Sequence, residues 1–209
     1  MNNKKPAMFC DFDGFKFNTL PAHRDYINQK YNINIITLEY SHGDKLEDLI
    51  NQYLSHEDKV TRAYVYEDLA KNFLTSIDWH KEVKPFEDMP EVMKELSQKY
   101  RIMTVTARQK TSINSIQYLI DKFIPDCIEE IHCVWEHLGN GEFKENSKRD
   151  FILNHKGEKI GFFDDSPKEI LRLHDAIPSY LFDPTGLHDS NLEIENRIRS
   201  WKEIGDLLL

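Results

Sequence analysis

The chain has 209 residues, of which 40% are hydrophobic, and its acidic residues outnumber its basic ones to give a formal net charge of −9. This composition is typical of a globular protein with one sizeable core, and no apolar run approaches the roughly 20 residues that a membrane-spanning helix needs. The negative charge disfavours a nucleic acid polymer as partner, because such binding depends on Lys and Arg at the phosphates.

The cysteines are few and lack the spacing of a structural site. They are Cys10, Cys127 and Cys133, with no C-x-x-C pair among them. A disulfide framework and a zinc site are therefore not expected. The first residues contain two lysines but no apolar segment of the length found in secretory signals. We therefore expect a cytoplasmic protein that does not bind a membrane.

Short apolar runs with the length of buried strands alternate with helical patterns along most of the chain. The predicted strands are AMFC (7–10), RIMTVT (101–106), EIHCVW (130–135), KIGFF (159–163) and SYLF (179–182). Apolar residues recur at helical spacing in 89–96, in 113–123 and in 201–208. This alternation predicts an α/β fold in which a parallel sheet is flanked by helices.

Residues 17–87 interrupt the alternation. Apolar residues recur there at helical spacing in 46–53 and 60–77, without the alternation of a strand. The span therefore predicts a small helical insert, and its aromatic residues are expected in the core of that insert. They are Tyr53, Tyr64, Tyr66, Phe73 and Trp79. Further along, the Asn-Gly pair in LGNGEF (138–143) predicts a hairpin or a tight loop.

Polar residues follow the predicted strands at the points where the strands end. They are Asp11, Asp13, Thr106, Asp164 and Asp165, with Lys148 at the start of a predicted helix. Ligands of open α/β sheets bind at the carboxyl ends of the strands, so we expect these side chains to lie close together. Four carboxylates in one crevice repel one another unless a cation is bound. Oxygen ligands without histidine favour a hard ion, and Mg²⁺ suits a phosphorylated substrate.

Four segments, in order, resemble the motifs of the haloacid dehalogenase (HAD) phosphatase superfamily. They are DFDG, MTVTAR, SKRDFI and FFDDSP. Within the superfamily, TVTAR, FFDDSP, LFDPTG and the closing SWKEI look most like the 5′-nucleotidase and deoxyribonucleotidase-like branch. The resemblance implies a Rossmann-like HAD core made of residues 1–16 and 88–209. It also implies a helical cap at residues 17–87, inserted after the first strand.

The resemblance also implies a role for each motif position. Asp11 would be the nucleophile that forms an aspartyl-phosphate, and Asp13 the acid that protonates the leaving oxygen and then the base that activates water. The implied substrate-binding residues are Gly14, Thr106, Ala107 and Lys148. Lys144 is an alternative to Lys148 as the lysine that neutralises charge on nucleophile and phosphate.

The metal ion implied by the resemblance is Mg²⁺. Its ligands would be Asp11, the backbone carbonyl of Asp13, and Asp165, with Asp164 supporting them from behind; the order of Asp164 and Asp165 is open. Substrate and waters would complete the coordination.

The sequence departs from the family pattern directly after DFDG. The family usually has Thr or Val after the glycine, whereas this chain continues with Phe15, Lys16 and Phe17. We expect that loop to face the cap and to bear on recognition of the leaving group. Arg108, next to the second motif, is expected either to touch the substrate or to be a solvated charge.

Taken together, the sequence predicts a Mg²⁺-dependent phosphomonoester hydrolase that acts through an aspartyl-phosphate intermediate. The expected substrate is a small phosphorylated metabolite such as a nucleoside 5′-monophosphate. One alternative is a sugar-phosphate or other metabolite phosphatase. The other, from a different class, is a catalytically silent phosphate-binding or regulatory module.

Overall fold

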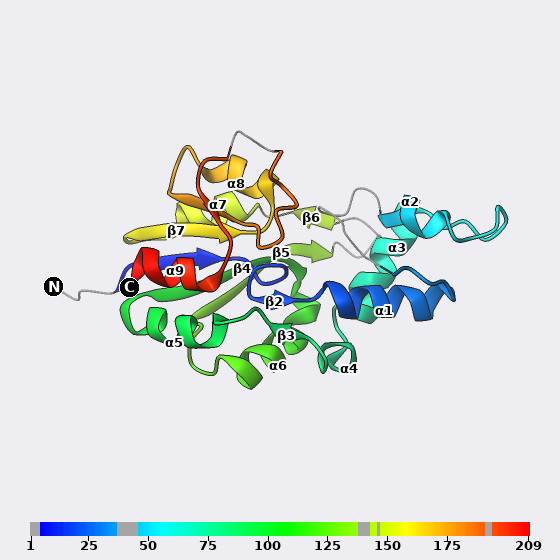
Figure 1. Ribbon diagram of the computed structural model, residues 1–209, viewed down its shortest axis with the longest axis horizontal. Coiled ribbons are helices and arrows are strands. Elements are labelled where there is room, and N and C mark those ends of the chain that lie inside the picture. Colours follow the sequence, from blue (N-terminus) through cyan, green and yellow to red (C-terminus); the bar gives the residue numbers. More distant parts are fainter. Residues whose placement is uncertain (1–4, 37–45, 138–142, 146, 191–193) are drawn as a thin grey trace.

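The computed structural model describes residues 5–36, 46–137, 143–145, 147–190 and 194–209 (Figure 1). The strands are β1 (Ala7–Cys10), β2 (Phe17–Asn18), β3 (Lys84–Pro85), β4 (Arg101–Gln109), β5 (Glu130–His137), β6 (Phe143–Glu145), β7 (Lys159–Asp164), β8 (Ser179–Phe182) and β9 (Arg197–Ile198). The α-helices are α1 (Leu20–Tyr31), α2 (Leu46–Asn51), α3 (Arg62–Asp68), α4 (Ile77–His80), α5 (Met89–Lys99), α6 (Ile113–Phe123), α7 (Lys148–Asn154), α8 (Pro167–Leu173) and α9 (Trp201–Leu208). A π-helix, η1 (Leu69–Phe73), and a 3₁₀ turn, η2 (Lys110–Ser112), complete the set.

A seven-stranded sheet in the order β6-β5-β4-β1-β7-β8-β9 forms the centre of the fold. All neighbouring strands pair in parallel except β5 and β6, which pair antiparallel. The predicted α/β class with a parallel sheet is therefore confirmed. The Asn-Gly pair of the predicted turn lies outside the described residues, although β5 and β6 on either side of it form a hairpin.

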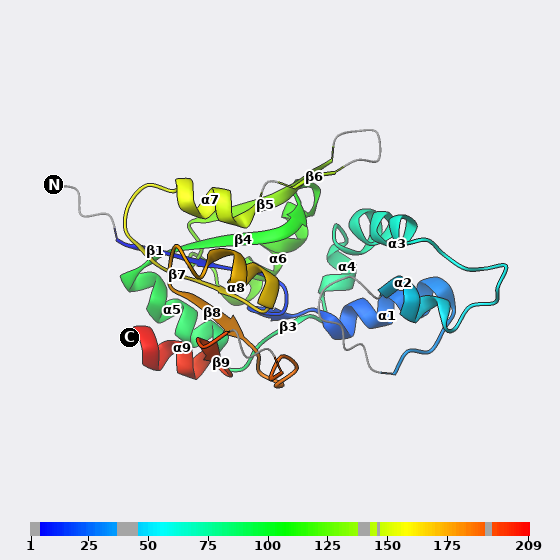
Figure 2. The same ribbon diagram turned by 90° about the horizontal axis from the view of Figure 1, so that it is seen from above.

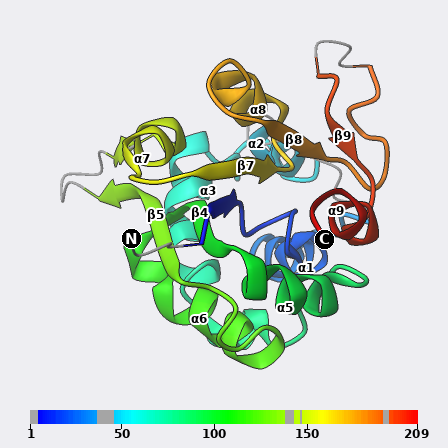
Figure 3. The ribbon, with the colours of Figure 1, turned by 90° about the vertical axis from the view of Figure 1, so that its left-hand side faces the viewer.

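Helices cover both faces of the sheet (Figure 3). Alternate residues of β1 point to opposite faces, as the pleat requires. Met8 and Cys10 join a cluster with side chains of α5, α6 and α9, whereas Ala7 and Phe9 join a second cluster with side chains of α7 and α8. All four residues of β1 are buried, so this strand is the interior of the fold and whatever follows it lies at the centre of the sheet edge.

The insert after β1 is mostly helical and has a hydrophobic cluster of its own. Helices α1 to α4 lie beyond the end of the sheet at which the strands finish (Figures 1 and 2). The buried residues of the insert include Ile27, Leu46, Ile50, Val65 and Phe73. The division of the chain at residues 17 and 87 itself stays a prediction.

Two details of the insert differ from the sequence prediction. Its entry and exit form a short antiparallel pair, β2 with β3, where Phe17 lies opposite Pro85, and a pair of two-residue strands is too short to give an alternating pattern. In addition, Tyr53 and Tyr64 are each 50% exposed, so these two rings lie on the surface and not in the core of the insert.

In the part of the chain that the structure describes, no helix combines the length and the apolar character needed to cross a membrane.

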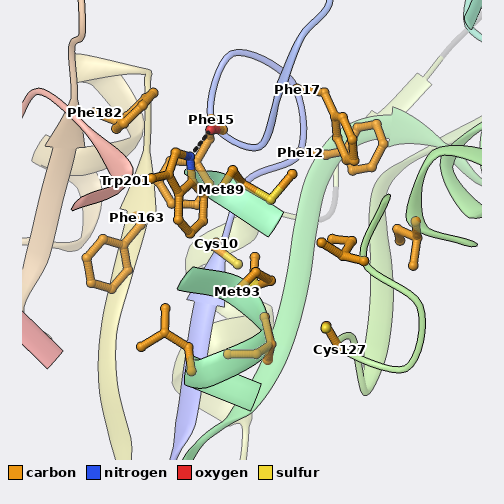
Figure 4. Close-up of a cluster of buried hydrophobic side chains, with 14 of the residues drawn as sticks. Cys10, Phe12, Phe15, Phe17, Met89, Met93, Cys127, Phe163, Phe182 and Trp201 are labelled. Atoms are coloured by element: carbon orange, nitrogen blue, oxygen red, sulfur yellow. Dashed lines mark hydrogen bonds between the residues drawn. The ribbon is translucent and has the colours of Figure 1, made fainter. Parts of the chain in front are cut away.

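The indole of Trp201 joins the last helix to the turn after β1. Its Nε1–H donates to the carbonyl of Phe15 (2.9 Å), and the two rings pack with centroids 4.7 Å apart (Figure 4).

We expect Trp201→Phe to lower the free energy of unfolding by about 1–3 kcal/mol, because a buried carbonyl loses its donor. Denaturant titration measures this, with Leu207→Ala on the exposed side of the same helix as control, expected within about 0.5 kcal/mol of wild type. Equal stability of all three proteins would contradict the prediction.

Candidate active site

The predicted site residues lie at the carboxyl ends of the three central strands. Asp11 directly follows β1, and its N–H donates to the carbonyl of Phe163 in β7 (2.9 Å). Asp164 is the last residue of β7, and Thr106 lies near the end of β4. Because β1 lies between β4 and β7 and all three are parallel, these residues share one edge of the sheet.

A buried ammonium group connects two of the acids. Nζ of Lys148 donates to Oδ1 of Asp11 (2.8 Å) and to Oδ2 of Asp164 (2.7 Å). Lys148 is the first residue of α7, and the Ser147 hydroxyl caps that helix by accepting the N–H of residue 150 (3.0 Å). The start of this helix therefore delivers the lysine to the sheet edge. The side chain of Lys144, the alternative lysine, lies outside the described part.

Charge and burial act in opposite directions on these groups. Burial lowers the pKa of Lys148, but the carboxylates of Asp11 and Asp164 outweigh it and raise the pKa above its usual range. Burial raises the pKa of Asp11, Lys148 opposes this, and repulsion from Asp164 and Asp13 adds to it, which leaves the pKa at about 6. The lysine therefore stays charged, and the acids around it are not fully neutralised by it.

Three carboxylates converge beside this lysine. Asp11, Asp164 and Asp165 each offer an oxygen, and the three oxygens lie within 4.8 Å of one another. Both oxygens of Asp164 have protein donors, since Oδ2 binds Lys148 and Oδ1 accepts the N–H of Ser166 (2.8 Å). In the described residues, the Asp165 carboxylate has neither a hydrogen bond nor an ion pair, and burial with repulsion from Asp164 and Asp11 raises its pKa well above the usual range.

This donor set fits a hard divalent cation. Carboxylate oxygens without nitrogen or sulfur ligands suit Mg²⁺, and an acid lacking a donor among converging acids is where a cation lowers the repulsion most. The geometry therefore favours Asp165 over Asp164 as a direct ligand. The backbone carbonyl of Asp13 stays a predicted ligand, and its carboxylate is not part of the three-acid group.

Gly14 is required by its surroundings. Its φ of +67° lies in the left-handed region, and a Cβ built on it would be 1.9 Å from Oδ2 of Asp165. The turn after β1 therefore lies directly against the acid cluster. Of the other predicted substrate-binding residues, Ala107 is exposed and Thr106 is buried, with a hydroxyl that accepts the N–H of Arg108 (3.3 Å). Among the described residues, no hydrogen bond joins Thr106 to the acid cluster.

Asp13 has a different partner from the other acids. Nε of Arg108 donates to Oδ2 of Asp13 (2.8 Å) and Nη2 donates to Oδ1 (2.7 Å). Arg108 is 2% exposed, so it is not the solvated charge that the sequence left open. Burial raises the pKa of Asp13, but the guanidinium group outweighs it and holds the pKa below its usual range. No local sequence pattern indicates this pair, because its members are far apart in the chain.

The turn from Phe15 to Phe17 does not face the cap, and that expectation is wrong. Both rings are fully buried: Phe15 packs on Phe182 and Trp201 (Figure 4), and Phe17 packs on Phe12.

Lys16, between these two rings, is also fully buried, and its ammonium donates to the carbonyls of Asp11 and of Cys10 (3.4 Å). The departure from the family pattern therefore builds the core behind Asp11 and does not line a leaving-group pocket.

Two buried histidines of the insert lie near the Asp13–Arg108 pair, and sequence reasoning missed them because they have no ligand spacing. His80 Nδ1 lies 2.6 Å from the carbonyl of Ser76, and because a carbonyl only accepts, Nδ1 is the donor. Burial and the nearby Arg108 charge lower the pKa of His80 to about 4, and burial lowers the pKa of His23 to about 4.

Neither a protein-family model nor a curated protein sequence matches this chain. Solved structures do match over nearly their whole length. A haloacid dehalogenase-like hydrolase from Streptococcus pneumoniae is 14% identical, with 98% of this chain and 99% of that chain covered and a TM-score of 0.64.

Two further structures carry ligands. CbbY from Rhodobacter sphaeroides, solved in complex with phosphate, is 12% identical, with 97% of both chains covered and a TM-score of 0.64. YfnB from Bacillus subtilis, bound to magnesium, is 12% identical, with 99% of both chains covered and a TM-score of 0.63. At these identities the similarity establishes the fold: this chain has the Rossmann-like HAD fold.

Acid is expected to destabilise the protein through His80. The folded pKa of about 4 lies below the ordinary value near 6.5, so this contribution to stability is present above pH 6.5 and is lost as the pH falls toward 4. Between pH 7 and pH 5 the loss is about 2 kcal/mol. Denaturant titrations at both pH values should show a correspondingly smaller loss for His80→Gln, whereas the exposed His56→Gln should behave as wild type. The same loss in all three proteins would contradict the assignment.

Proposed function

We propose that this chain is a Mg²⁺-dependent phosphomonoester hydrolase with Asp11 as its nucleophile. The observation that carries the proposal is the arrangement around Asp11. Lys148 binds its Oδ1, while in the described residues its Oδ2 has no hydrogen bond, and Asp165 lies alongside it without a cation partner. A carboxylate that is held through one oxygen while the other is free suits in-line attack on a phosphoryl group.

The reaction divides into two steps. Oδ2 of Asp11 attacks phosphorus as the bond to the leaving oxygen breaks. Asp13, which is ionised beside Arg108 in the free protein, would take up a proton from solvent as the substrate binds and donate it to this oxygen. Asp13 then accepts a proton from water, which attacks the aspartyl-phosphate and releases inorganic phosphate and free Asp11. General acid–base help of this kind is worth about 10²–10⁴-fold in rate.

Charge stabilisation comes from the residues around the nucleophile. Lys148 offsets negative charge on Asp11 and on the phosphoryl oxygens, and Thr106 with the backbone of Gly14 and Ala107 would bind those oxygens. Asp11, Asp165 and the Asp13 carbonyl would hold Mg²⁺, with Asp164 behind them. A bound Mg²⁺ supplies further charge neutralisation for the transferring phosphoryl group. The magnesium in YfnB and the phosphate in CbbY support this part of the proposal by similarity of fold.

The substrate we propose is a small phosphorylated metabolite, with a nucleoside 5′-monophosphate as the leading case. The helical insert, proposed as a cap over residues 17–87, lies beyond the end of the sheet where the acids gather, and a cap there favours small substrates over polymers. The choice of a nucleotide rests on the resemblance of TVTAR and FFDDSP to the 5′-nucleotidase-like branch, and a sugar phosphate is the alternative. The three buried free cysteines support a reducing, cytoplasmic location.

A screen of phosphomonoesters with and without Mg²⁺ tests the activity. We expect phosphate release from small esters in Mg²⁺, and we expect Asp11→Asn to abolish it because an amide oxygen does not replace the carboxylate as nucleophile. Asp121→Asn, on the exposed side of α6, is the matched control and should retain the wild-type rate. Turnover of no ester by wild type would refute the hydrolase proposal, and near wild-type turnover by Asp11→Asn would refute the covalent route.

Mg²⁺ binding also has a readout without substrate. Mg²⁺ at tenfold its Kd should stabilise the folded protein by about 1.4 kcal/mol, because only the folded state gathers the acids. Thermal melts over a Mg²⁺ series should show a rising Tm for wild type and a flat one for Asp165→Asn. The exposed Glu91→Gln serves as control and should follow wild type. A flat Tm for wild type would rule out the metal site.

A further inference from the structure

The guanidinium group of Arg108 contacts three separate parts of the molecule. Through Nε and Nη2 it holds both oxygens of Asp13, in the turn after β1. Through Nη1 it donates to the Ser115 hydroxyl of α6 (3.2 Å) and to the carbonyl of Leu74 in the insert (3.5 Å). The Ser115 hydroxyl also donates to the Leu74 carbonyl. In the ion pair of Arg108 with Asp13, the arginine side chain is 2% exposed and is therefore almost fully shielded from water.

This geometry uses the shape of arginine. A planar fork binds both oxygens of one carboxylate while a third nitrogen points elsewhere, and a lysine ammonium has no equivalent arrangement. Since Leu74 directly follows η1 of the insert, a displacement of the insert removes one acceptor of Arg108 and disturbs the fork on Asp13. The orientation of Asp13 and the position of the insert are therefore physically linked.

We propose that Arg108 is a positioning residue that sets the orientation of the Asp13 carboxylate and makes it depend on the docked position of the insert. The inference rests on the proposed function, in which Asp13 transfers the proton to the leaving oxygen. Arg108 touches neither the nucleophile nor the acid cluster in any described contact, so it acts through Asp13. An acid misplaced by about 1 Å loses on the order of 10²-fold in rate.

A second contact between α6 and the insert supplies the comparison. Nζ of Lys122 donates to the carbonyl of Lys81 (2.8 Å), just after α4. This contact holds the same helix to the insert without touching Asp13. Lys122→Met therefore removes one attachment of the insert while leaving the contacts of Arg108 and Ser115 with Leu74 in place, whereas Arg108→Met removes the fork on Asp13.

The kinetic test compares an alkyl phosphate with p-nitrophenyl phosphate, whose leaving group needs no proton. For Arg108→Met we expect kcat on the alkyl ester to fall roughly 10–100-fold more than kcat on the nitrophenyl ester, since general acid help matters only for the poor leaving group. For Lys122→Met we expect the same factor on both esters. Equal losses on both esters for Arg108→Met would overturn the proposal.

Two additions keep the test decisive if Arg108→Met folds poorly. Ser115→Ala keeps the ion pair and removes the hydroxyl shared by Arg108 and Leu74, so it should show the same leaving-group selectivity to a smaller degree; a loss of equal size on both esters would count against the proposal. Arg108→Lys keeps the charge without the fork, so it should retain the defect on the alkyl ester. Full recovery by lysine would show that charge alone suffices and would overturn the positioning role.

Hydrogen exchange tests the link without any activity. Coupling between two sites is reciprocal, so Asp13→Asn should speed amide exchange in residues 69–76 as Arg108→Met does. Unchanged exchange there in Asp13→Asn would overturn the coupling. If wild type hydrolyses no ester, the proposed function fails while this arm still decides the linkage.

Discussion

The ammonium group of Lys148 lies between the carboxylates of Asp11 and Asp164, and the rest of the sheet edge is arranged around that contact. Removing one partner from a buried ion pair costs about 3–5 kcal/mol, since the other charge is left uncompensated. The strand order must therefore place β1 beside β7, and the N-cap residue Ser147 must start helix α7 at Lys148. One lysine does not neutralise three converging acids, so Asp165 is still repelled by Asp164 and Asp11. A bound cation would reduce this repulsion.

The two acids of DFDG serve different parts of the fold although they lie two residues apart. Asp11 belongs to the core through Lys148, whereas Asp13 turns to Arg108 and so to the insert. Lys16 stabilises the turn between the two acids, because its buried ammonium donates to the Asp11 carbonyl at the end of β1. In the proposed mechanism, attack on phosphorus and proton transfer are therefore assigned to two acids that are anchored in different parts of the fold.

Local sequence patterns predicted the strands and the group of acids, whereas contacts between residues far apart in the chain could not be predicted. Runs of apolar residues predicted β1, β4, β5, β7 and β8. Because ligands of parallel sheets bind where the strands end, the same analysis predicted that Asp11, Asp164 and Asp165 lie close together. The partner of Asp13 lies in another strand far along the chain, and no periodicity points to it. The expectation for Phe15 and Phe17 was wrong because a position next to a motif says nothing about side-chain direction. Phe15 packs on Trp201 of the last helix, which is distant in sequence, and Phe17 packs on Phe12.

The central position of β1 has a consequence for how the chain is made. This wholly apolar strand is synthesised before both of its partners: Ala7 pairs with Arg101 of β4, and β7 follows later still. Until then its backbone donors and acceptors have no strand to pair with, and such an unpaired apolar segment favours association with other chains. The residues of the hydrophobic cluster of the insert, by contrast, all precede β4 in the chain. The stage before β4 emerges is therefore the one at which β1 has neither of its pairing partners.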